Sequence, residues 1–470
     1  MFFPSLSPFL LLSLCVLCRA DRTPGFRVPI RRVPRLRPLA FSSNVLTTDV
    51  SITNRNEFAY LVSVSVGDQQ FSVILDTGSS DFWIVSSDCT TPDCTGVQKY
   101  YKEQSSSLSL SGTPFTLSYL MGSVTGNVGF ETIEIGRFQI SSQVFALANR
   151  TLGLGLSTTG NSGILGLSFP SIAAISLANG DTLLENILSN FDEPDRFFAF
   201  KLGSGSGPDD LTSSFTLGEL DSNITSDLNS FSFTPVSKAG ADSFNYWKLP
   251  LQSLTIDSTT FVLSPSLIPD AKAPIAVLDT GTTLILGPTL DVDAFWRAVN
   301  QEGATRKNAR TGLWEVKCDR GVSVSFLLGE KGNERPYPVN PSDVNWEEGG
   351  SEDGWCMGGI QPNDGVNSGD WLLGDVFLRN VYVTHHHANS THQPLIGLLN
   401  MTDPETAMIR FRNDRGPDQS VPSTHWIRQN VPSTTSPRTA IVYMISSVSG
   451  FVVGAMVTLF VRIRRQRALF

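Results

Sequence analysis

Apolar stretches in this chain are short, and they alternate with clusters of Gly, Ser and Asn. Most of them are rich in Val, Ile, Phe and Thr, a composition that predicts β-strands bounded by turns. Helical periodicity is scarce, and residues 181–188 and 291–300 are the best helix candidates. A length of 470 residues leaves room for two domains. The pattern therefore predicts a mostly β protein with a large core.

Two of the apolar runs are followed directly by the same triplet, Asp-Thr-Gly. These runs are residues 71–75 and residues 273–278. The first triplet begins at Asp76 and the second at Asp279. Two similar half-chains of this kind can bring both carboxylates to one site. Carboxylates held that close cannot both ionise comfortably, so they share a proton and act together as general base and general acid. Such a pair activates water against a peptide bond without a metal, a cofactor or a covalent intermediate.

Further motifs accompany the two triplets in a fixed order along the chain. Residues 71–87 continue from the first triplet through Trp83, and residues 162–170 read Ser-Gly-Ile-Leu-Gly-Leu-Ser-Phe-Pro. Residues 371–379 read Trp-Leu-Leu-Gly-Asp-Val-Phe-Leu-Arg. On this set of motifs, the chain from about residue 55 to residue 412 resembles the pepsin-like aspartic proteases.

This resemblance implies a bilobal, mostly β fold with the active site in the cleft between two similar β-rich lobes. The N-terminal lobe is expected at residues 51–235, with the first catalytic Asp, and the C-terminal lobe at residues 236–412, with the second. It also implies an aspartic endopeptidase that acts on protein or peptide substrates and is favoured by acidic pH, because the carboxylate pair needs one proton.

The resemblance assigns roles to the residues of both triplets. Asp76 and Asp279 form the catalytic pair, one ionised as general base and the other protonated as general acid. Gly78 and Gly281 let the backbone approach the carboxylates closely. The other supporting residues are two threonines that hydrogen-bond across the loops, Thr77 and Thr280, and two residues whose hydroxyls donate to the outer carboxylate oxygens, Ser79 and Thr282.

A flap hairpin is implied by residues 115–126. Tyr119 resembles the flap tyrosine that closes over substrate and bonds Trp83. Leu120 and Met121 stand where the family usually has Gly and a small polar residue, so the flap tip is expected to reshape the substrate pockets.

Pocket residues are also implied by the resemblance. Phe145 and Ile164 match positions that line the pocket for the residue before the cut, while Tyr246 and Trp247 open the matching strand of the second lobe. Packing in the core explains apolar residues at these positions equally well.

Four of the five histidines lie close together, as His385-His386-His387 and His392. The run replaces the aromatic-Asp-Arg segment that the family usually has near a strand end. Adjacent residues of a strand point to opposite faces, so these three histidines cannot all bind one metal. We expect a structural or incidental surface role, with a metal site or an acid-sensing patch as the alternatives.

The N-terminal region contains two expected segments. Residues 1–20 are apolar and end at a small-residue cleavage site, which predicts a signal peptide, with a signal anchor as the alternative. Residues 21–50 carry many arginines and no apolar periodicity, which predicts a removable basic pro-segment. Such a segment pairs with acidic groups at neutral pH and is released as carboxylates protonate.

The C-terminal region contains three expected segments. Residues 413–439 form a Pro/Ser/Thr-rich stalk. Residues 440–461 contain no charged side chain and predict a transmembrane helix, and residues 462–470 form a basic tail. The positive-inside rule puts this tail in the cytosol and makes the chain a single-pass type I membrane protein.

Three consequences follow for the membrane segment. The body then faces the lumen of an acidic endomembrane compartment or the cell exterior. A glycolipid-anchor signal is the rival interpretation, against which the basic end argues. Within the span, Gly450 and Gly454 form a GxxxG motif, for which a helix dimer and ordinary small-residue packing are both open.

Charge and cysteine content agree with a secreted body. The net charge is −9 at pH 7 although both ends are rich in Arg, so the body between them is more acidic still and repels nucleic acid. Two of the six cysteines fall in the signal peptide, and the other four allow three pairings. A short Thr-Pro-Asp turn favours Cys89 with Cys94, which leaves Cys318 with Cys356. The spacing of these four cysteines matches no zinc-binding pattern.

Four glycosylation sequons begin at Asn149, Asn223, Asn389 and Asn400, which also fits a secreted body.

Two other functional classes remain as alternatives to a membrane-tethered peptidase. One is a catalytically inactive binding module on the same fold, although both aspartates are intact. The other is a retroviral-type half-enzyme that must dimerise, which the presence of two triplets in one chain makes unnecessary.

Overall fold

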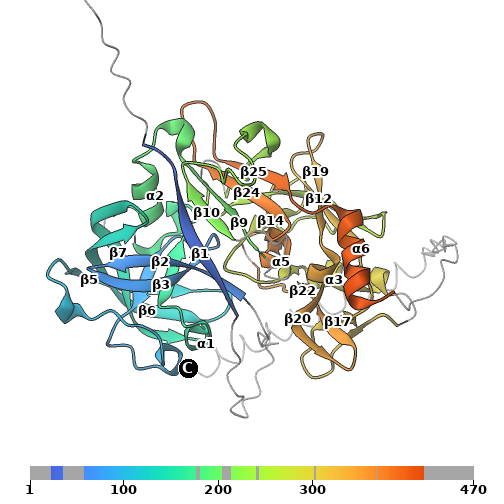
Figure 1. The fold of residues 1–470 in the computed structure, drawn as a ribbon, viewed down its shortest axis with the longest axis horizontal. Coiled ribbons are helices and arrows are strands. Elements are labelled where there is room, and N and C mark those ends of the chain that lie inside the picture. The colour runs from blue at the N-terminus through green and yellow to red at the C-terminus, as the bar shows by residue number, and fades with distance from the viewer. Residues whose placement is uncertain are drawn as a thin grey trace, which may run out of the picture. The chain divides into compact units, whose positions relative to one another are not determined.

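The computed structural model describes residues 23–34, 58–175, 180–203, 213–239, 243–300, 303–366 and 368–417 (Figure 1). The predicted signal peptide, transmembrane helix and basic tail lie outside these residues, as does nearly all of the predicted stalk. Among the residues described, no helix is both long enough and apolar enough to span a bilayer.

The described chain is mostly β, as the sequence predicted, and its strands form three sheets. The order in the largest sheet is β11 (Ser232–Pro235), β25 (Leu395–Asn400), β24 (Val381–His386), β9 (Phe197–Lys201), β10 (Ser214–Leu217), β1 (Phe26–Pro34), β2 (Phe58–Val66), β3 (Gln69–Asp76), β8 (Gly163–Gly166), β4 (Phe82–Val85), β7 (Phe138–Leu152), β6 (Ser123–Ile135) and β5 (Ser109–Ser118).

The second sheet belongs to the C-terminal lobe. Its order is β19 (Arg335–Val339), β18 (Val324–Leu328), β12 (Lys248–Ile256), β14 (Ile275–Leu278), β23 (Trp371–Leu373), β15 (Ile285–Gly287) and β22 (Ile360–Pro362), with β13 (Thr259–Phe261) paired to β12. The third sheet has the order β16 (Thr305–Lys307), β17 (Trp314–Lys317), β21 (Trp355–Gly358) and β20 (Asn345–Glu352).

Helices are short and lie in the connections between strands. The α-helices are α1 (Leu156–Thr159), α2 (Leu183–Leu188), α3 (Thr289–Val299), α4 (Pro341–Val344), α5 (Asp375–Leu378) and α6 (Pro404–Arg415). Single 3₁₀ turns are η1 (Pro92–Cys94), η2 (Lys102–Gln104), η3 (Pro170–Ile172), η5 (Glu193–Asp195) and η6 (Leu228–Ser230).

The same strand arrangement occurs once in each lobe. In the first lobe, β3 pairs antiparallel with β2 and parallel with β8. In the second lobe, β14 pairs antiparallel with β12 and parallel with β23. Because β3 and β14 hold equivalent places, both triplets emerge at the same point of a similar scaffold. The sequence-level prediction of two similar lobes therefore describes the observed fold.

Strands from both lobes share the largest sheet, and this sheet joins the lobes. Strand β24, from the end of the second lobe, pairs with β9 of the first lobe, and β25 pairs with β11. Figure 1 shows β24 and β25, in orange, next to the green strands β9 and β10. The two half-chains that carry the Asp-Thr-Gly triplets are thus connected through continuous backbone hydrogen bonding.

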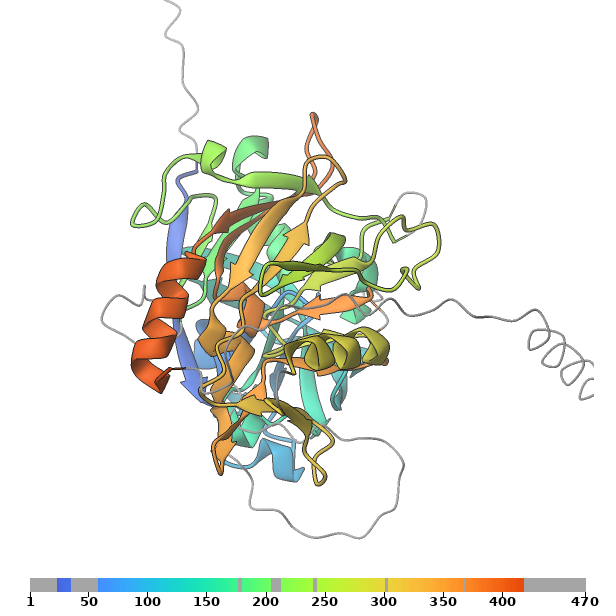
Figure 2. The same ribbon diagram turned by 90° about the vertical axis from the view of Figure 1, so that its right-hand side faces the viewer.

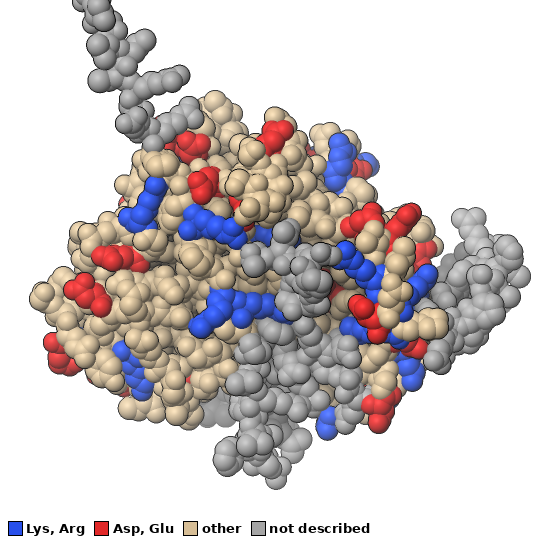
Figure 3. All heavy atoms as spheres, viewed as in Figure 1, with Lys and Arg blue, Asp and Glu red and all other residues tan. Residues whose placement is uncertain are grey.

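Strand β1 was not predicted, because residues 21–50 show no apolar periodicity. The strand pairs with β2 on one side and β10 on the other, so its neighbours supply the backbone partners that stabilise it. Val28 is buried, whereas Arg27 and Arg31 are exposed. The Arg27 guanidinium lies 3.1 Å from the Asp221 carboxylate, and basic side chains follow the course of β1 in Figure 3.

Both predicted helices are present, with boundaries shifted by one or two residues. Helix α2 begins after Thr182, whose hydroxyl accepts a hydrogen bond from the Glu185 amide at 3.4 Å. Helix α3, Thr289–Val299, corresponds to the helix predicted at residues 291–300. Helix α6 was not predicted, because only Ala407 and Phe411 are buried and no apolar stripe forms. It extends past residue 412, the expected end of the C-terminal lobe, and Figure 2 shows it in orange-red at the left of the second-lobe strands.

The first two residues of the histidine run end β24, and His387 follows the strand and is half-buried. For His385 and His386, the expectation of a surface role is wrong. His385 is completely buried, with its ring stacked on Phe198 at a centroid distance of 4.5 Å. His386 is also buried and stacks on Phe197 at 4.6 Å. Sequence reasoning could not show this burial, because it results from pairing β24 between β9 and β25. Within the described residues, no group of three or more His, Cys, Asp or Glu side chains is arranged to hold a metal ion.

Candidate active site

The two aspartates of the triplets meet at one site. Asp76 ends β3 and Asp279 follows β14, and both are buried. A Cβ atom built on Gly78 would lie 2.6 Å from Asp279 Oδ1, and one built on Gly281 would lie 2.4 Å from Asp76 Oδ1. Each carboxylate therefore lies against the glycine of the opposite loop. Only glycine leaves room for this approach, which is the role expected of both residues.

Each carboxylate accepts the same two hydrogen bonds from its own loop. The Gly78 amide donates to Asp76 Oδ1 at 2.8 Å, and the Ser79 hydroxyl donates to Oδ2 at 2.5 Å. The Gly281 amide and the Thr282 hydroxyl donate to Asp279 at 2.8 and 2.7 Å. These bonds favour the ionised form and fix the orientation of both carboxylates.

Thr77 and Thr280 join the two loops through four hydrogen bonds. Each threonine amide donates to the other threonine's hydroxyl, at 3.1 and 3.0 Å. The Thr77 hydroxyl donates to the Leu278 carbonyl at 2.9 Å, and the Thr280 hydroxyl donates to the Leu75 carbonyl at 2.8 Å. All of these groups are buried, so breaking one bond leaves a polar group without a partner.

Burial and the neighbouring charge raise the pKa of Asp76. Desolvation is the larger cause, the Asp279 carboxylate is the next, and the hydrogen bonds from Ser79 and Gly78 oppose both. A proton on Asp76 relieves the repulsion between the two carboxylates. The geometry therefore supports one shared proton on the pair, the state that paired acid and base catalysis requires.

The hairpin of β5 and β6 carries the residues that the sequence assigned to the flap. Its turn is closed by the Tyr119 amide, which donates to the Gly122 carbonyl at 3.0 Å. Trp83 is completely buried, and its indole N–H donates to the Tyr119 hydroxyl at 2.7 Å. Burial and the charge of Asp76 raise the pKa of Tyr119 well above its ordinary value, so this tyrosine lies close to the carboxylate pair.

The tip of the hairpin is apolar and exposed. The exposed fraction is 45% for Leu120 and 41% for Met121. The backbone beside them is tightly placed, because a Cβ atom built on Gly122 would lie 2.3 Å from the Leu152 carbonyl oxygen. Leu120 and Met121 thus project from a hairpin whose backbone is held against the end of β7.

The residues expected to line a pocket differ in their surroundings. Phe145 is completely buried and packs against Phe82 and Tyr100, with centroid distances of 6.3 and 6.2 Å, so it lies in the core. Ile164 is 7% exposed and belongs to the apolar cluster that also contains Trp83. Burial and the charges of Asp279 and Asp76 raise the pKa of Tyr246 above its ordinary value. This indicates that Tyr246 lies near both carboxylates.

Two further site residues were missed at the sequence level. Asp81 is completely buried and accepts hydrogen bonds from the amides of Ala174 and Ile175 at 3.0 and 2.8 Å. Its position five residues after Asp76 within an apolar segment was the available signal. The second missed residue is Lys248, a buried cation on β12. No sequence pattern indicated it.

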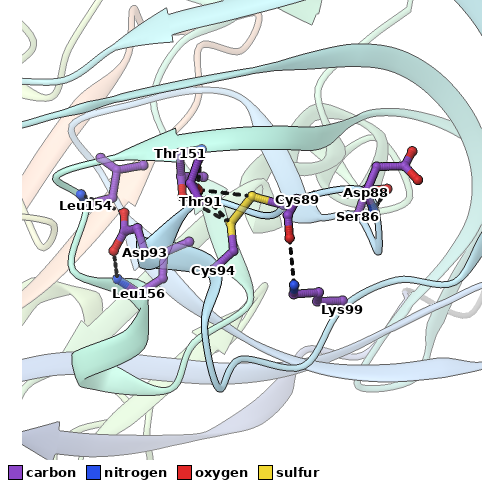
Figure 4. The surroundings of a disulfide bond; sticks show 10 residues. All are labelled: Ser86, Asp88, Cys89, Thr91, Asp93, Cys94, Lys99, Thr151, Leu154 and Leu156. Carbon is purple, nitrogen blue, oxygen red and sulfur yellow. Dashed lines mark hydrogen bonds between the residues drawn. A yellow bond between two sulfur atoms is a disulfide. The ribbon is translucent and has the colours of Figure 1, made fainter.

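The cysteines are joined as the local spacing favoured, Cys89 with Cys94 and Cys318 with Cys356. Figure 4 shows the first disulfide, next to which the Asp93 carboxylate accepts hydrogen bonds from the Leu154 and Leu156 amides, each at 2.9 Å. This loop therefore anchors the start of α1. Three of the four sequon asparagines are exposed, namely Asn149, Asn223 and Asn400. The fourth, Asn389, is half-buried.

A two-lobed β fold with paired, buried aspartates in Asp-Thr-Gly loops defines the class of aspartic proteases. A family model described as eukaryotic aspartyl protease matches residues 59–393. The chain belongs to this family; it is a pepsin-like aspartic endopeptidase.

Curated relatives cover most of the described body. Pepsin A of Sus scrofa is 30% identical over 353 residues, which cover 73% of this chain and 83% of the relative. Chymosin of Ovis aries is 29% identical over 352 residues, covering 74% and 82%. Embryonic pepsinogen of Gallus gallus is 29% identical over 360 residues, covering 75% and 84%.

Proposed function

We propose that Asp76 and Asp279 are the catalytic residues of this endopeptidase. The observation that carries the proposal is the contact of each carboxylate with the glycine of the opposite loop, because it brings both acids to one point. Buried carboxylates that lie this close titrate as a unit, so the shared proton belongs to the pair.

In the proposed reaction the ionised member of the pair removes a proton from water as its oxygen bonds to the scissile carbonyl carbon. The protonated member donates to the carbonyl oxygen, which gives a tetrahedral intermediate. Return of a proton to the amide nitrogen then breaks the carbon–nitrogen bond and releases an acid and an amine. Closure of the hairpin that carries Tyr119 excludes bulk water during these steps.

Acidic pH is expected to favour activity. Burial and the charge of Asp279 hold a proton on the pair, and a second ionisation at higher pH removes the acid that the reaction needs. Activity should therefore fall as the pH rises and the pair loses that proton.

The decisive experiment uses the full-length chain in detergent, Asp76→Asn and Asp279→Asn variants, and an unfolded protein as substrate at acidic pH. Each variant should lose at least two to three orders of magnitude in kcat, roughly the contribution of general acid–base catalysis. Asp270→Asn, in an exposed turn, is the matched control and should retain activity. Substrate binding without cleavage by the wild-type chain would instead favour an inactive binding module.

We also propose that the endopeptidase is made as a zymogen and tethered to a membrane, with its body lumenal or extracellular. The support is the apolar segment 440–461 followed by the basic tail, together with the signal peptide and the arginine-rich pro-segment. Glycosylation at Asn149, Asn223 and Asn400 would agree with this orientation. The test is protection of the body, but not of the basic tail, from protease added to sealed microsomes, together with a mass decrease on glycosidase treatment.

A further inference from the structure

Lys248 is a buried cation in the strand next to the second catalytic loop. It begins β12, and only 3% of its surface is exposed. Lysine is almost never this buried without a charged partner. The position therefore requires an explanation that the catalytic pair does not provide.

The register of the sheet places Lys248 on the same face as Asp279. Lys248 pairs directly with Val277 of β14, and Asp279 lies two residues beyond Val277. Directly paired residues share a face of a sheet, as do residues two apart on one strand. The Cα atoms of diagonal neighbours of this kind are roughly 7–8 Å apart. Tyr246, two residues before Lys248, is influenced by both catalytic charges, which agrees with this placement.

The first lobe offers an internal comparison. There the equivalent cross-strand row consists of Leu61, Ile74 and Ile164, with Ile74 two residues before Asp76. In the second lobe, the row consists of Lys248, Val277 and Leu372. Each lobe thus has an equivalent row of three residues next to its aspartate. All three residues are apolar in the first lobe, whereas in the second lobe the first residue of the row is the cation Lys248.

No carboxylate in the described part of the chain pairs with the Lys248 ammonium, and no side chain or carbonyl there accepts a hydrogen bond from it. Its nitrogen is not fully enclosed, unlike the ring nitrogens of His385. Burial lowers the pKa of Lys248, and no neighbouring charge contributes. A buried cation without a partner is destabilising, unless a ligand supplies the missing anion.

We propose that Lys248 is a specificity-determining residue that binds a carboxylate side chain of the peptide substrate. The Lys248 side chain leaves β12 on the face that carries Asp279. The acidic residue of the substrate would therefore be within about three positions of the scissile bond, because successive residues of an extended peptide are roughly 3.3 Å apart. The inference rests on the proposed peptidase function and names a substrate class for it: peptides with Glu or Asp close to the cut.

The test compares matched peptides that carry Glu or Gln at each of the three positions on either side of the cut. The assay is run at about pH 5.5, where Glu, with an ordinary pKa near 4.3, is ionised. The wild-type chain should cleave the Glu peptide roughly tenfold more efficiently in kcat/KM at one position, the size expected for a charge-assisted hydrogen bond. That preference should shrink as the pH falls and the Glu side chain becomes protonated.

Variants separate the role of the ammonium from general effects. Lys248→Gln should bring the Glu-to-Gln ratio close to one, and Lys248→Arg should retain the preference. Lys331→Gln, which changes an exposed lysine between β18 and β19, should leave the ratio unchanged. The wild-type ratio and its pH dependence need no variant, so the test survives a folding defect.

The possible failures are distinguishable. Cleavage of all peptides by the wild-type chain, with equal rates for Glu and Gln at every position, overturns the inference and leaves the peptidase function intact. A preference for Glu that persists in Lys248→Gln also overturns it. Absence of any cleavage overturns the proposed function itself, and the inference with it.

Discussion

Thr77 and Thr280 each donate a backbone N–H to the other's side-chain hydroxyl, across a separation of 203 residues in the sequence. Their hydroxyls then donate to the carbonyls of the strands that lead into the opposite loops. The two carboxylates are therefore positioned by a buried network that belongs to both lobes, and neither lobe could form it alone.

Thr280→Val should reduce both stability and activity. Valine has nearly the same shape, but it removes the acceptor for the Thr77 amide and the donor to the Leu75 carbonyl. Each buried group left without a partner costs about 1–3 kcal/mol. Urea denaturation should show a decrease of this size or larger, with a lower kcat, whereas Thr280→Ser should keep both near wild type. A Val variant with wild-type stability would contradict this role.

Gly281→Ala should damage catalysis more than folding. The new methyl group would lie 2.4 Å from Asp76 Oδ1, so the carboxylate must move. A displacement of about 1 Å in a catalytic group can lower the rate roughly a hundredfold. Gly129→Ala is a suitable control, because its Cβ atom would meet nothing closer than 3.3 Å. Equal kcat values in the two variants would show that the close approach is unimportant.

Tyr119→Phe should lower kcat/KM by about tenfold or more. The change removes the hydroxyl that accepts the Trp83 indole N–H and leaves that buried donor without a partner. Because the bond holds the hairpin in place, Trp83→Phe should have less effect in the Tyr119→Phe background than in the wild type. A double-mutant cycle on kcat/KM measures this coupling, and strictly additive effects would exclude it.

Leu120→Gly combined with Met121→Ser should change selectivity without changing stability. Both side chains are exposed at the hairpin tip, so the free energy of unfolding should stay within about 0.5 kcal/mol. Cleavage profiles on a peptide library should shift toward bulkier residues near the scissile bond, because the tip becomes smaller. An unchanged profile would mean that the tip does not contact substrate.

His386→Phe should make the protein more resistant to acid. Burial, together with the charges of His392 and His387, lowers the pKa of His386 from 6.5 to about 4. The unfolded chain binds a proton at this position below pH 6.5 and the folded chain does not. The stabilising effect of the neutral ring is therefore present above pH 6.5 and is lost as the pH falls toward about 4.

The size of this effect is up to about 3 kcal/mol, because one pKa unit corresponds to about 1.4 kcal/mol. Urea denaturation of the wild type at several pH values should show the loss, and the Phe variant should show a smaller one. His425→Gln, in the predicted stalk segment, is the control and should follow the wild type. Parallel pH profiles for the wild type and His386→Phe would refute the assignment.

Local signals made part of the site predictable. A strand-forming run followed by Asp-Thr-Gly appears twice, and a turn between Cys89 and Cys94 favours one disulfide. Each of these depends on residues that are neighbours in the chain. The choice between core and pocket for Phe145, and the position of Tyr246 next to both charges, could not be settled in this way, because they depend on packing between distant strands.

The two acidic loops, the mostly β composition and the family could all be predicted from the amino-acid sequence, because they follow from short motifs whose chemistry is local. Three other features became visible in the folded protein: β1 lies between β2 and β10, His385 and His386 are buried, and Lys248 leaves its strand on the face of Asp279. These features depend on strand register: when strands pair, residues far apart in the chain become neighbours, and the partner strand determines which side chains are buried and which charges they face.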